Sequence, residues 1–217
     1  DGGYALAGYT SSFGAFGYDF WLVKTDASGT VQWNKTYHGT IYDLAFALVQ
    51  TVDGGYALAG LTGDLSTDQG DFWLVKTDAE GTVQWNKTYG GTNHDYAYSL
   101  VQTVDGGYAL AGWTGSFGAG IDDFWLVKTD ADGNMQWNKT YGGTFHDWAF
   151  DLVQTTDGGY ALAGYTTSFG EYDFWLVKTD ASGTVQWNKT YGGTYADEAH
   201  SLVQTVDGGY ALAGWTG

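Results

Sequence analysis

Four aspartates recur at nearly equal spacing along this chain of 217 residues. Each stands directly before a short apolar segment, and they lie 52, 52 and 50 residues apart: Asp43, Asp95, Asp147 and Asp197. Like carboxylates gathered in a folded protein repel one another unless they bind a cation or accept hydrogen bonds from turns. Because the available ligands are oxygens, Ca²⁺ is the cofactor that this pattern could support. The simpler interpretation, which we favour, is an aspartate that caps its own loop.

Two of these aspartates follow a histidine, which adds the elements of acid–base chemistry. His94-Asp95 and His146-Asp147 resemble acid–base pairs, but Tyr42 and Ala196 take the place of the histidine in the other two copies. The chain has no Gly-x-Ser-x-Gly nucleophile motif, no phosphate-binding loop and no His-Glu-x-x-His motif. Catalysis normally requires one asymmetric constellation, so these residues predict a protein that is not an enzyme.

The tripeptide Asn-Lys-Thr also recurs, and it is an acceptor sequence for N-glycosylation in secreted proteins. Its copies begin at Asn34, Asn86, Asn138 and Asn188. Coincidence within a duplicated segment is the alternative explanation.

Composition excludes several classes of partner. The formal net charge is −17, with eight Lys and Arg residues against 25 Asp and Glu, and the chain has no Cys. Nucleic acid is therefore an unsuitable partner, since no basic surface can neutralise phosphates, and the same holds for an anionic membrane surface. No disulfide or thiolate metal site can form. No apolar run reaches the roughly 18 residues that a membrane span needs.

The strongest feature of the chain is an internal repeat. The octapeptide Asp-Gly-Gly-Tyr-Ala-Leu-Ala-Gly begins at Asp1, Asp53, Asp105, Asp157 and Asp207. These positions define repeats 1–52, 53–104, 105–156 and 157–206 and a partial repeat 207–217. Such a period indicates an array of one supersecondary unit that shares a continuous core, so we expect residues 1–217 to form one domain.

One repeat contains four predicted strands. In the second copy these are residues 54–60, 71–77, 82–89 and 96–103, which are short, rich in aromatic and β-branched residues, and separated by turn residues. The turn Asp78-Ala79-Glu80-Gly81 is typical of an antiparallel hairpin with a bulge. Four antiparallel strands in about 52 residues predict an all-β protein whose units are β-propeller blades. A β-solenoid is the structural rival.

The segment Asp-Ala-Ser-Gly-Thr-Val-Gln-Trp, residues 26–33 and again 180–187, resembles the tryptophan-docking motif of quinoprotein-type propellers. The turn here is one residue shorter than in that motif, and the likeness to the Asp-box of sialidase propellers is weaker. The resemblance implies that one tryptophan per repeat docks between blades, which assigns a structural role to Trp33, Trp85, Trp137 and Trp187. The whole repeat is also similar to repeats of large secreted bacterial and archaeal surface proteins, which implies an extracellular or cell-surface location.

The resemblance also implies a strand order A-B-C-D within each blade, with B formed by the Tyr-Ala-Leu-Ala-Gly segment. Strand D is then an exposed edge, and its Lys35, Lys87, Lys139 and Lys189 discourage unwanted pairing. The chain begins and ends with strand B and therefore has 17 strands, one more than four blades need. We expect four four-stranded blades of about 52 residues plus one extra terminal strand. The chain is then a piece of a larger propeller, a ring with a redundant strand, or a molecule whose last strand pairs with a partner.

The repeats differ from one another in two loops, which follow strand B and strand D. The B–C segments are residues 10–18, 62–70, 114–122 and 166–172, and the D–A segments are residues 38–46, 92–98, 144–150 and 194–200. Both kinds of loop emerge on the same face of a propeller, and variable loops on a rigid scaffold are the usual place for binding. The predicted binding face comprises Phe13, Tyr42, His94, Trp113, Phe117, Phe145, His146, Trp148 and Tyr195. Neutral drift with local packing is the alternative.

We therefore expect a non-catalytic interaction or scaffold module that binds a protein or carbohydrate ligand through this face. A filament-forming structural protein that uses the surplus strand is one alternative. A fragment of a glycosidase or of a quinoprotein-like enzyme is the other.

Overall fold

The computed structural model describes residues 2–64, 67 and 69–217. Asp1, which opens the first octapeptide, and three positions of the segment 62–70 lie outside the described residues. The described part is all-β, with 17 strands and no helix, and hence no helix that could cross a membrane. In chain order the strands are β1 (Ala5–Thr10), β2 (Asp19–Thr25), β3 (Val31–Tyr37), β4 (Tyr42–Gln50), β5 (Tyr56–Asp64), β6 (Gln69–Thr77), β7 (Val83–Tyr89), β8 (Asp95–Gln102), β9 (Tyr108–Thr114), β10 (Asp123–Thr129), β11 (Met135–Tyr141), β12 (Asp147–Gln154), β13 (Tyr160–Thr166), β14 (Asp173–Thr179), β15 (Val185–Tyr191), β16 (Asp197–Gln204) and β17 (Tyr210–Thr216).

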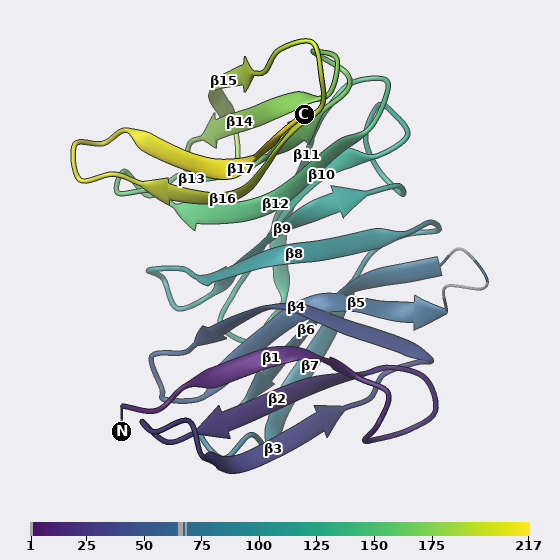
Figure 1. Ribbon diagram of the computed structural model, residues 1–217, viewed down its shortest axis with the longest axis vertical. Coiled ribbons are helices and arrows are strands. Elements are labelled where there is room, and N and C mark those ends of the chain that lie inside the picture. Colours follow the sequence, from purple (N-terminus) through teal and green to yellow (C-terminus); the bar gives the residue numbers. More distant parts are fainter. Residues whose placement is uncertain (1, 65–66, 68) are drawn as a thin grey trace. The chain divides into compact units, whose positions relative to one another are not determined.

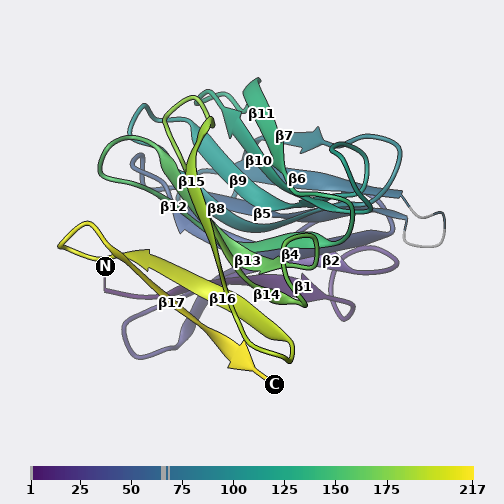
Figure 2. The same ribbon diagram turned by 90° about the horizontal axis from the view of Figure 1, so that it is seen from above.

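The strands form five separate sheets of consecutive strands (Figure 1). Three sheets have four strands, in the orders β4-β5-β6-β7, β8-β9-β10-β11 and β12-β13-β14-β15. The described part of the chain adds a three-stranded sheet β1-β2-β3 and a two-stranded sheet β16-β17, which Figure 2 shows from a second direction. The predicted A-B-C-D order is confirmed in the three four-stranded sheets, and the sheets are antiparallel blades of a propeller-like fold. The observed sheets thus hold three, four, four, four and two strands instead of four complete blades and one strand.

Burial explains the composition of each strand. Every residue of β9 and β10 is buried, because the central strands of a blade are covered on both faces. Their sequences accordingly read as nearly continuous apolar runs. Strand D is mostly exposed, as β11 shows, and carries the predicted lysine on the outer edge of its sheet. An apolar run therefore marks the strands between blades, and a polar strand marks the blade's edge.

The C–D turns have the predicted geometry. Their glycines have φ between 75° and 84°, a conformation that glycine adopts without steric cost: Gly29, Gly81, Gly133 and Gly183. Asp78 Oδ1 accepts hydrogen bonds from the backbone N–H groups of Glu80 (3.0 Å) and Thr82 (2.7 Å). The register of β6 and β7 shifts between Lys76 and Thr77, which is the expected bulge.

Neighbouring blades are held together by large aromatic contacts. The rings of Phe124 on β10 and Trp175 on β14 lie 4.6 Å apart, and both residues are buried. The Tyr141 hydroxyl donates a hydrogen bond of 2.8 Å to the carbonyl of Gly183 in the C–D turn of the next blade. The equivalent contacts in the first two blades are Phe20–Trp73 and a hydrogen bond from the Tyr37 hydroxyl to the Gly81 carbonyl.

A buried lysine lies at the other end of each strand C. Lys128 is only 4% exposed, and its Nζ donates to the Thr129 carbonyl, to Gln136 Oε1 and to Asp105 Oδ2 at 2.8 Å. The same ion pair joins Lys76 to Asp53 and Lys178 to Asp157. In these three repeats the aspartate that opens the octapeptide is therefore the counter-ion of a buried cation.

The chain divides into two compact units, residues 1–97 and 98–217, with the boundary inside β8. The first contains blades β1–β3 and β4–β7, and the second contains β9–β17 with most of β8. Each unit is described by itself below.

Candidate functional site

The two kinds of variable loop meet within each unit. In the first unit the Thr40 hydroxyl of a D–A loop donates to the carbonyl of Gly63 at 2.8 Å, at the end of strand B. In the second unit the backbone N–H of Phe145 donates to Ser168 Oγ of a B–C loop at 3.0 Å. We call the surface formed by segments 114–122, 144–150, 166–172 and 194–200 of the second unit the loop face.

The four recurring aspartates are buried beneath these loops, and they hold the loop backbone. Asp147 Oδ2 accepts hydrogen bonds from the Gly143 N–H (2.8 Å) and the Ser168 hydroxyl (2.7 Å), and its Oδ1 accepts from Thr166. Asp43 accepts in the same way from Gly39 N–H at 2.7 Å and from the Thr62 hydroxyl. These contacts are the loop caps that the sequence offered as an alternative to a metal site.

Each of these aspartates also faces a second carboxylate from the start of strand C of the preceding blade. We call the resulting pairs the carboxylate pairs: Asp19 with Asp43, Asp71 with Asp95, Asp123 with Asp147, and Asp173 with Asp197. Burial raises the pKa of Asp71, Asp123 and Asp173, and the facing carboxylate raises it further. Burial also raises the pKa of Asp43. The strand C partner was not among the predicted site residues, although an Asp precedes Phe-Trp-Leu-Val-Lys in all four repeats.

The first carboxylate pair contains a histidine between its members. His38 Nδ1 lies 2.8 Å from Asp19 Oδ1 and 3.5 Å from Asp43 Oδ2, and the three ligand atoms lie within 4.8 Å of one another. His38 directly follows the last residue of strand D, and glycine occupies this position in the other three repeats: Gly90, Gly142 and Gly192. The imidazole N–H therefore donates between two carboxylates in one copy, and the other copies have no side chain there.

An aromatic cluster lies in the second unit near the loop face. Trp113 and Trp148 are stacked, with ring centroids 4.9 Å apart and an interplanar angle of 12°. Trp148 also contacts Tyr165 at 5.6 Å, which in turn stacks on Tyr172 at 4.2 Å. Offset stacks of this kind stabilise each pair by about 0.5–1.5 kcal/mol beyond the area that they bury, so the cluster is a rigid platform.

The same cluster continues along the strands of type A. Phe150 on β12 contacts Tyr98 on β8 at 5.3 Å and stacks on His200 of β16 at 4.7 Å. Asp151 on β12 joins these strands as well, because it accepts from the Ser99 hydroxyl at 2.9 Å and from the Leu202 N–H at 2.7 Å. One carboxylate that occurs in a single repeat thus links three neighbouring strands of type A.

Two acids border the aromatic cluster, each beside a histidine. Asp122 Oδ2 accepts from His146 Nδ1 at 2.6 Å and from Trp148 Nε1 at 3.0 Å. Glu198 accepts from the Tyr172 hydroxyl through Oε1, and its Oε2 lies 3.0 Å from His200 Nε2. Both carboxylate side chains are largely buried, whereas both histidines are nearly half-exposed.

Tyr172 has a strained backbone, with φ of 96°, and it is the non-glycine residue with positive φ in the described part of the chain. A bulky residue in this region is an outlier that its surroundings must hold in place. Its B–C segment is two residues shorter than the equivalent one of the third repeat. The short loop leaves Tyr172 directly before β14, where its ring stacks on Tyr165 and its hydroxyl reaches Glu198.

The structure brings only part of the predicted binding face together. Trp113, His146 and Trp148 share the aromatic cluster. Phe13 and Phe117 instead pack on the strand C tryptophans of their own sheets, Trp21 at 5.7 Å and Trp125 at 5.4 Å.

The remaining predicted residues lie elsewhere. Tyr42 contacts Tyr18, and His94 contacts Tyr96, both in the first unit. On the loop face Phe145 is 53% exposed and Tyr195 is 71% exposed.

The sequence prediction missed the cluster residues Tyr98, Phe150, Tyr165 and Tyr172 and the bordering acids Asp122 and Glu198. Asp122, Phe150 and Tyr172 are the last residues of variable segments, so their variation between repeats could have identified them. Tyr165 lies on strand B at a position that holds Tyr9, Leu61 and Trp113 in other repeats, which is a variable position outside the loops.

Three of the four predicted docking tryptophans contact a tyrosine of the following blade. Trp33 contacts Tyr56 at 5.9 Å, Trp137 contacts Tyr160 at 5.8 Å, and Trp187 contacts Tyr210 at 5.7 Å. Trp85 is half-buried on β7.

The four asparagines of the Asn-Lys-Thr tripeptides are exposed on the same strands. Their Oδ1 atoms accept hydrogen bonds of 3.2–3.3 Å from Trp21, Trp73, Trp125 and Trp175. The Nδ2 atom, to which a glycan would be attached, is not used in these bonds.

Fold and loop cluster together define an all-β repeat protein of propeller-like blades. No family model matches the chain, and no curated protein matches it. Among solved structures, the chain is similar to a protein of unknown function from Bacteroides caccae, with a TM-score of 0.58 and 11% identity over 92% of this chain and 67% of that one.

Similarity to Sqt1 from Chaetomium thermophilum is lower, with a TM-score of 0.39 and 12% identity over 92% of this chain and 60% of that one. Sqt1 bound to the N-terminus of the ribosomal protein L10 gives a TM-score of 0.40 and 11% identity over 92% of this chain and 62% of that one. The likeness to the Bacteroides caccae protein supports the fold alone.

Proposed function

We propose that the chain is a non-catalytic binding module that engages a polypeptide ligand through the loop face of its second unit. The observation that carries the proposal is a pair of exposed aromatic side chains on the two D–A loops of this unit. Phe145 is 53% exposed and Tyr195 is 71% exposed. Aromatic residues are enriched in protein interfaces and dominate their binding energy. The rigid aromatic cluster nearby reduces the entropy lost when a ligand is bound.

The net charge of the chain limits the kind of polypeptide that the loop face would bind. The net charge of −17 favours a basic or neutral polypeptide over an acidic one, because like charges slow association and oppose it. Asp122 and Glu198 add acceptors at the border of the aromatic cluster. A carbohydrate is the other ligand class that aromatic residues beside carboxylates suit, and the experiment below separates the two.

The test compares the whole chain with the double variant Phe145→Ser, Tyr195→Ser on a displayed library of random peptides and on a glycan array. We expect the chain to enrich basic, aromatic-containing peptides and the double variant to bind them at least about tenfold more weakly. Phe13→Ser in the first unit is the matched control, since its ring packs on Trp21, and it should leave peptide binding unchanged. Binding to glycans alone, or equal loss in the control, would refute the proposal.

The proposal includes the finer architecture and location. We infer a tryptophan-docking propeller of the quinoprotein type in an extracellular or cell-surface protein. Exposed asparagines in four Asn-Lys-Thr tripeptides support secretion. Intact-mass measurement of native material tests glycosylation, because a mass equal to that of the sequence excludes it.

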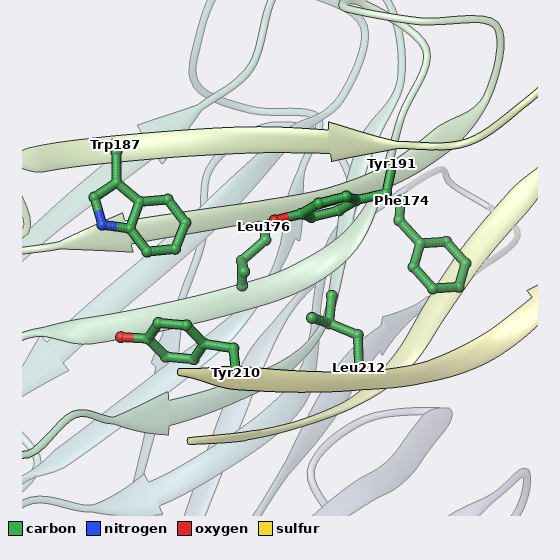
Figure 3. A pocket seen from close by; sticks show the side chains of 6 residues that line it. All are labelled: Phe174, Leu176, Trp187, Tyr191, Tyr210 and Leu212. Carbon is green, nitrogen blue, oxygen red and sulfur yellow. The ribbon is translucent and has the colours of Figure 1, made fainter. Parts of the chain in front are cut away.

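A filament-forming role is the second candidate, and a groove in the second unit favours it. This groove of about 370 Å³ is lined by Phe174, Leu176, Trp187, Tyr191, Tyr210 and Leu212 from β14, β15 and β17 (Figure 3). In the preceding blade the equivalent Phe124 and Tyr141 are covered by β14 and the C–D turn of the next blade. The groove therefore lies where the C–D hairpin of a following blade would pack.

The strand β17 has the sequence of residues 4–10, with Trp215 in place of Tyr9. It can therefore take the place of β1 beside β2 of a second copy, which would bring a C–D hairpin to the groove. Light scattering at increasing concentration tests this candidate. Growing assemblies that disappear when residues 207–217 are deleted would support it, and a monomer at every concentration would remove it.

A further inference from the structure

We propose that three of the carboxylate pairs, Asp71 with Asp95, Asp123 with Asp147 and Asp173 with Asp197, each bind a divalent cation, Ca²⁺, and that His38 replaces the cation in the first pair. This proposal is independent of ligand binding at the loop face. It assigns a role to the buried acids that the proposed function does not use.

The two carboxylates of each pair converge on one small space. If Gly142 carried a Cβ atom, both Asp123 Oδ1 and Asp147 Oδ2 would lie within 2.7 Å of it. The same holds within 2.8 Å for Gly90 and for Gly192 with their own pairs. The glycine thus leaves open a position that two carboxylate oxygens from neighbouring blades share.

In two of the three pairs, one carboxylate oxygen is buried and accepts no hydrogen bond. Asp123 is only 1% exposed, and its Oδ1 is buried with no hydrogen-bond partner. The equivalent Oδ1 of Asp173 is buried without a partner as well. Burial of an unpaired carboxylate oxygen beside a second carboxylate is costly, because both the lost hydration and the mutual repulsion oppose it.

The first carboxylate pair shows which kind of group can interact with both converging carboxylates. His38 stands where the other copies have glycine, and its Nδ1 lies 2.8 Å from Asp19 Oδ1 and 3.5 Å from Asp43 Oδ2. Asp19 Oδ1, the atom equivalent to the unpaired Asp123 Oδ1, therefore has a donor that can carry positive charge. The glycine copies have the same two oxygens and lack the imidazole.

The donors select a hard cation. Both converging atoms are carboxylate oxygens, and the Thr166 and Ser168 hydroxyls lie beside the third pair. A cavity of about 410 Å³ adjoins the second pair, lined among others by Asp71, Thr88 and Thr92, and one of about 300 Å³ adjoins the fourth, lined by Asp197 and Gly192. Water can therefore complete the coordination shell. Ca²⁺ accepts irregular sets of six to eight oxygens that include water, whereas Mg²⁺ demands a regular octahedron.

The experiment is calcium titration of the whole chain after chelator treatment, at an ionic strength of about 0.15 M so that diffuse binding to the acidic surface is screened. We expect three bound Ca²⁺ per chain and a thermal midpoint higher in calcium than in chelator. His38→Gly should bind a fourth ion, and Asp123→Asn should bind one fewer than the natural chain. Asp132→Asn, which removes an exposed carboxylate of a C–D turn, is the control and should still bind three.

Several outcomes would overturn the proposal. One is the absence of calcium binding at about 1 mM, the weak end of calcium affinities in proteins. Another is a stoichiometry that is the same in His38→Gly and the natural chain. If Asp123→Asn raises the midpoint without calcium while the natural chain does not respond to calcium, the pair holds a shared proton or a water molecule instead. Should Asp123→Asn fail to fold, His38→Gly still decides, because the His38 side chain is 46% exposed.

Discussion

Single residues at the blade junctions carry contacts that repeat from blade to blade, so the chain contains its own controls. Tyr141 is buried and donates to the Gly183 carbonyl, whereas Tyr191, at the same position of the next repeat, is 49% exposed. Lys128 is buried with three acceptors, whereas Lys139 on strand D is exposed. The same residue type should therefore contribute more to the free energy of unfolding at the buried position than at the exposed one.

Tyr141→Phe should destabilise the protein by about 1–2 kcal/mol, because the buried carbonyl of Gly183 loses its donor while the ring remains. Urea unfolding measures the change. Tyr191→Phe is the matched control and should change the free energy of unfolding by less than about 0.5 kcal/mol. Equal effects of the two substitutions would show that the hydrogen bond does not hold the blades together.

Lys128→Met should destabilise the protein by about 1–3 kcal/mol, since the Thr129 carbonyl and Gln136 lose a buried donor and Asp105 loses its counter-ion. Lys139→Met should be neutral within about 0.5 kcal/mol. Thermal unfolding of the two variants beside the natural chain makes the comparison. A neutral Lys128→Met would mean that the buried ammonium contributes nothing to stability.

At the scale of elements, strand C of one blade is the surface on which the preceding blade packs. Trp175 on β14 is buried against Phe124, and Trp73 on β6 against Phe20. Trp21 has the same position on β2, but it is only half-buried and contacts Phe13 of its own loop. Strand C thus stabilises the protein mainly where a preceding blade covers it.

Trp175→Ala should cost about 3–5 kcal/mol, the usual loss for a large aromatic residue removed from a core. Trp21→Ala should cost clearly less, since Trp21 is only half-buried and packs on Phe13 of its own loop. Chemical denaturation gives both values. The argument fails if the two substitutions are equally destabilising.

At the scale of the whole molecule, two sets of carboxylates respond to pH in opposite directions. The Lys76 ammonium and the Thr51 hydroxyl lower the pKa of Asp53 to about 2. Burial and the facing carboxylate raise the pKa of Asp71, Asp123 and Asp173. A lowered carboxylate pKa stabilises the native state above the unfolded pKa, and this contribution is lost as pH falls through about 2. A carboxyl group with a raised pKa stabilises the native state when it is protonated. This contribution is lost as pH rises through the pKa that the group has in the folded protein.

We therefore expect the free energy of unfolding in chelator to increase as pH falls from neutral toward the pKa of the raised carboxylates, and to decrease again below pH 4. Urea midpoints across this range measure the profile. Asp123→Asn should flatten the limb near neutral pH, because it removes one raised carboxylate, and Asp53→Asn should flatten the acid limb. If Asp123→Asn leaves the neutral limb unchanged, relief of the overall charge of −17 explains it instead.

Much of the fold could be predicted because the residues of each strand indicate whether its faces are covered or exposed. The apolar runs of β9 and β10 indicate strands covered on both faces, and Gly81 after Asp78 indicates the hairpin turn. The candidate site was predicted only in part. Phe117 has the composition of a binding residue but packs on Trp125, and Asp122 looks like an ordinary loop residue but accepts from His146 and Trp148. The Asp122 contacts join residues that are 24 and 26 positions apart in the sequence, so local patterns do not reveal them.

By itself the sequence determined the repeat, the four-strand unit and its order, because periodic burial and turn chemistry are local properties. Tertiary structure alone decided which acids meet. Asp123 and Asp147 belong to neighbouring blades, and they face each other only because β10 and β12 are brought together by blade packing. It also showed that one residue, histidine at position 38 and glycine at 90, 142 and 192, lies between such acids. That position lies at a junction between sheets, where His38 places a ring nitrogen between two buried carboxyl groups.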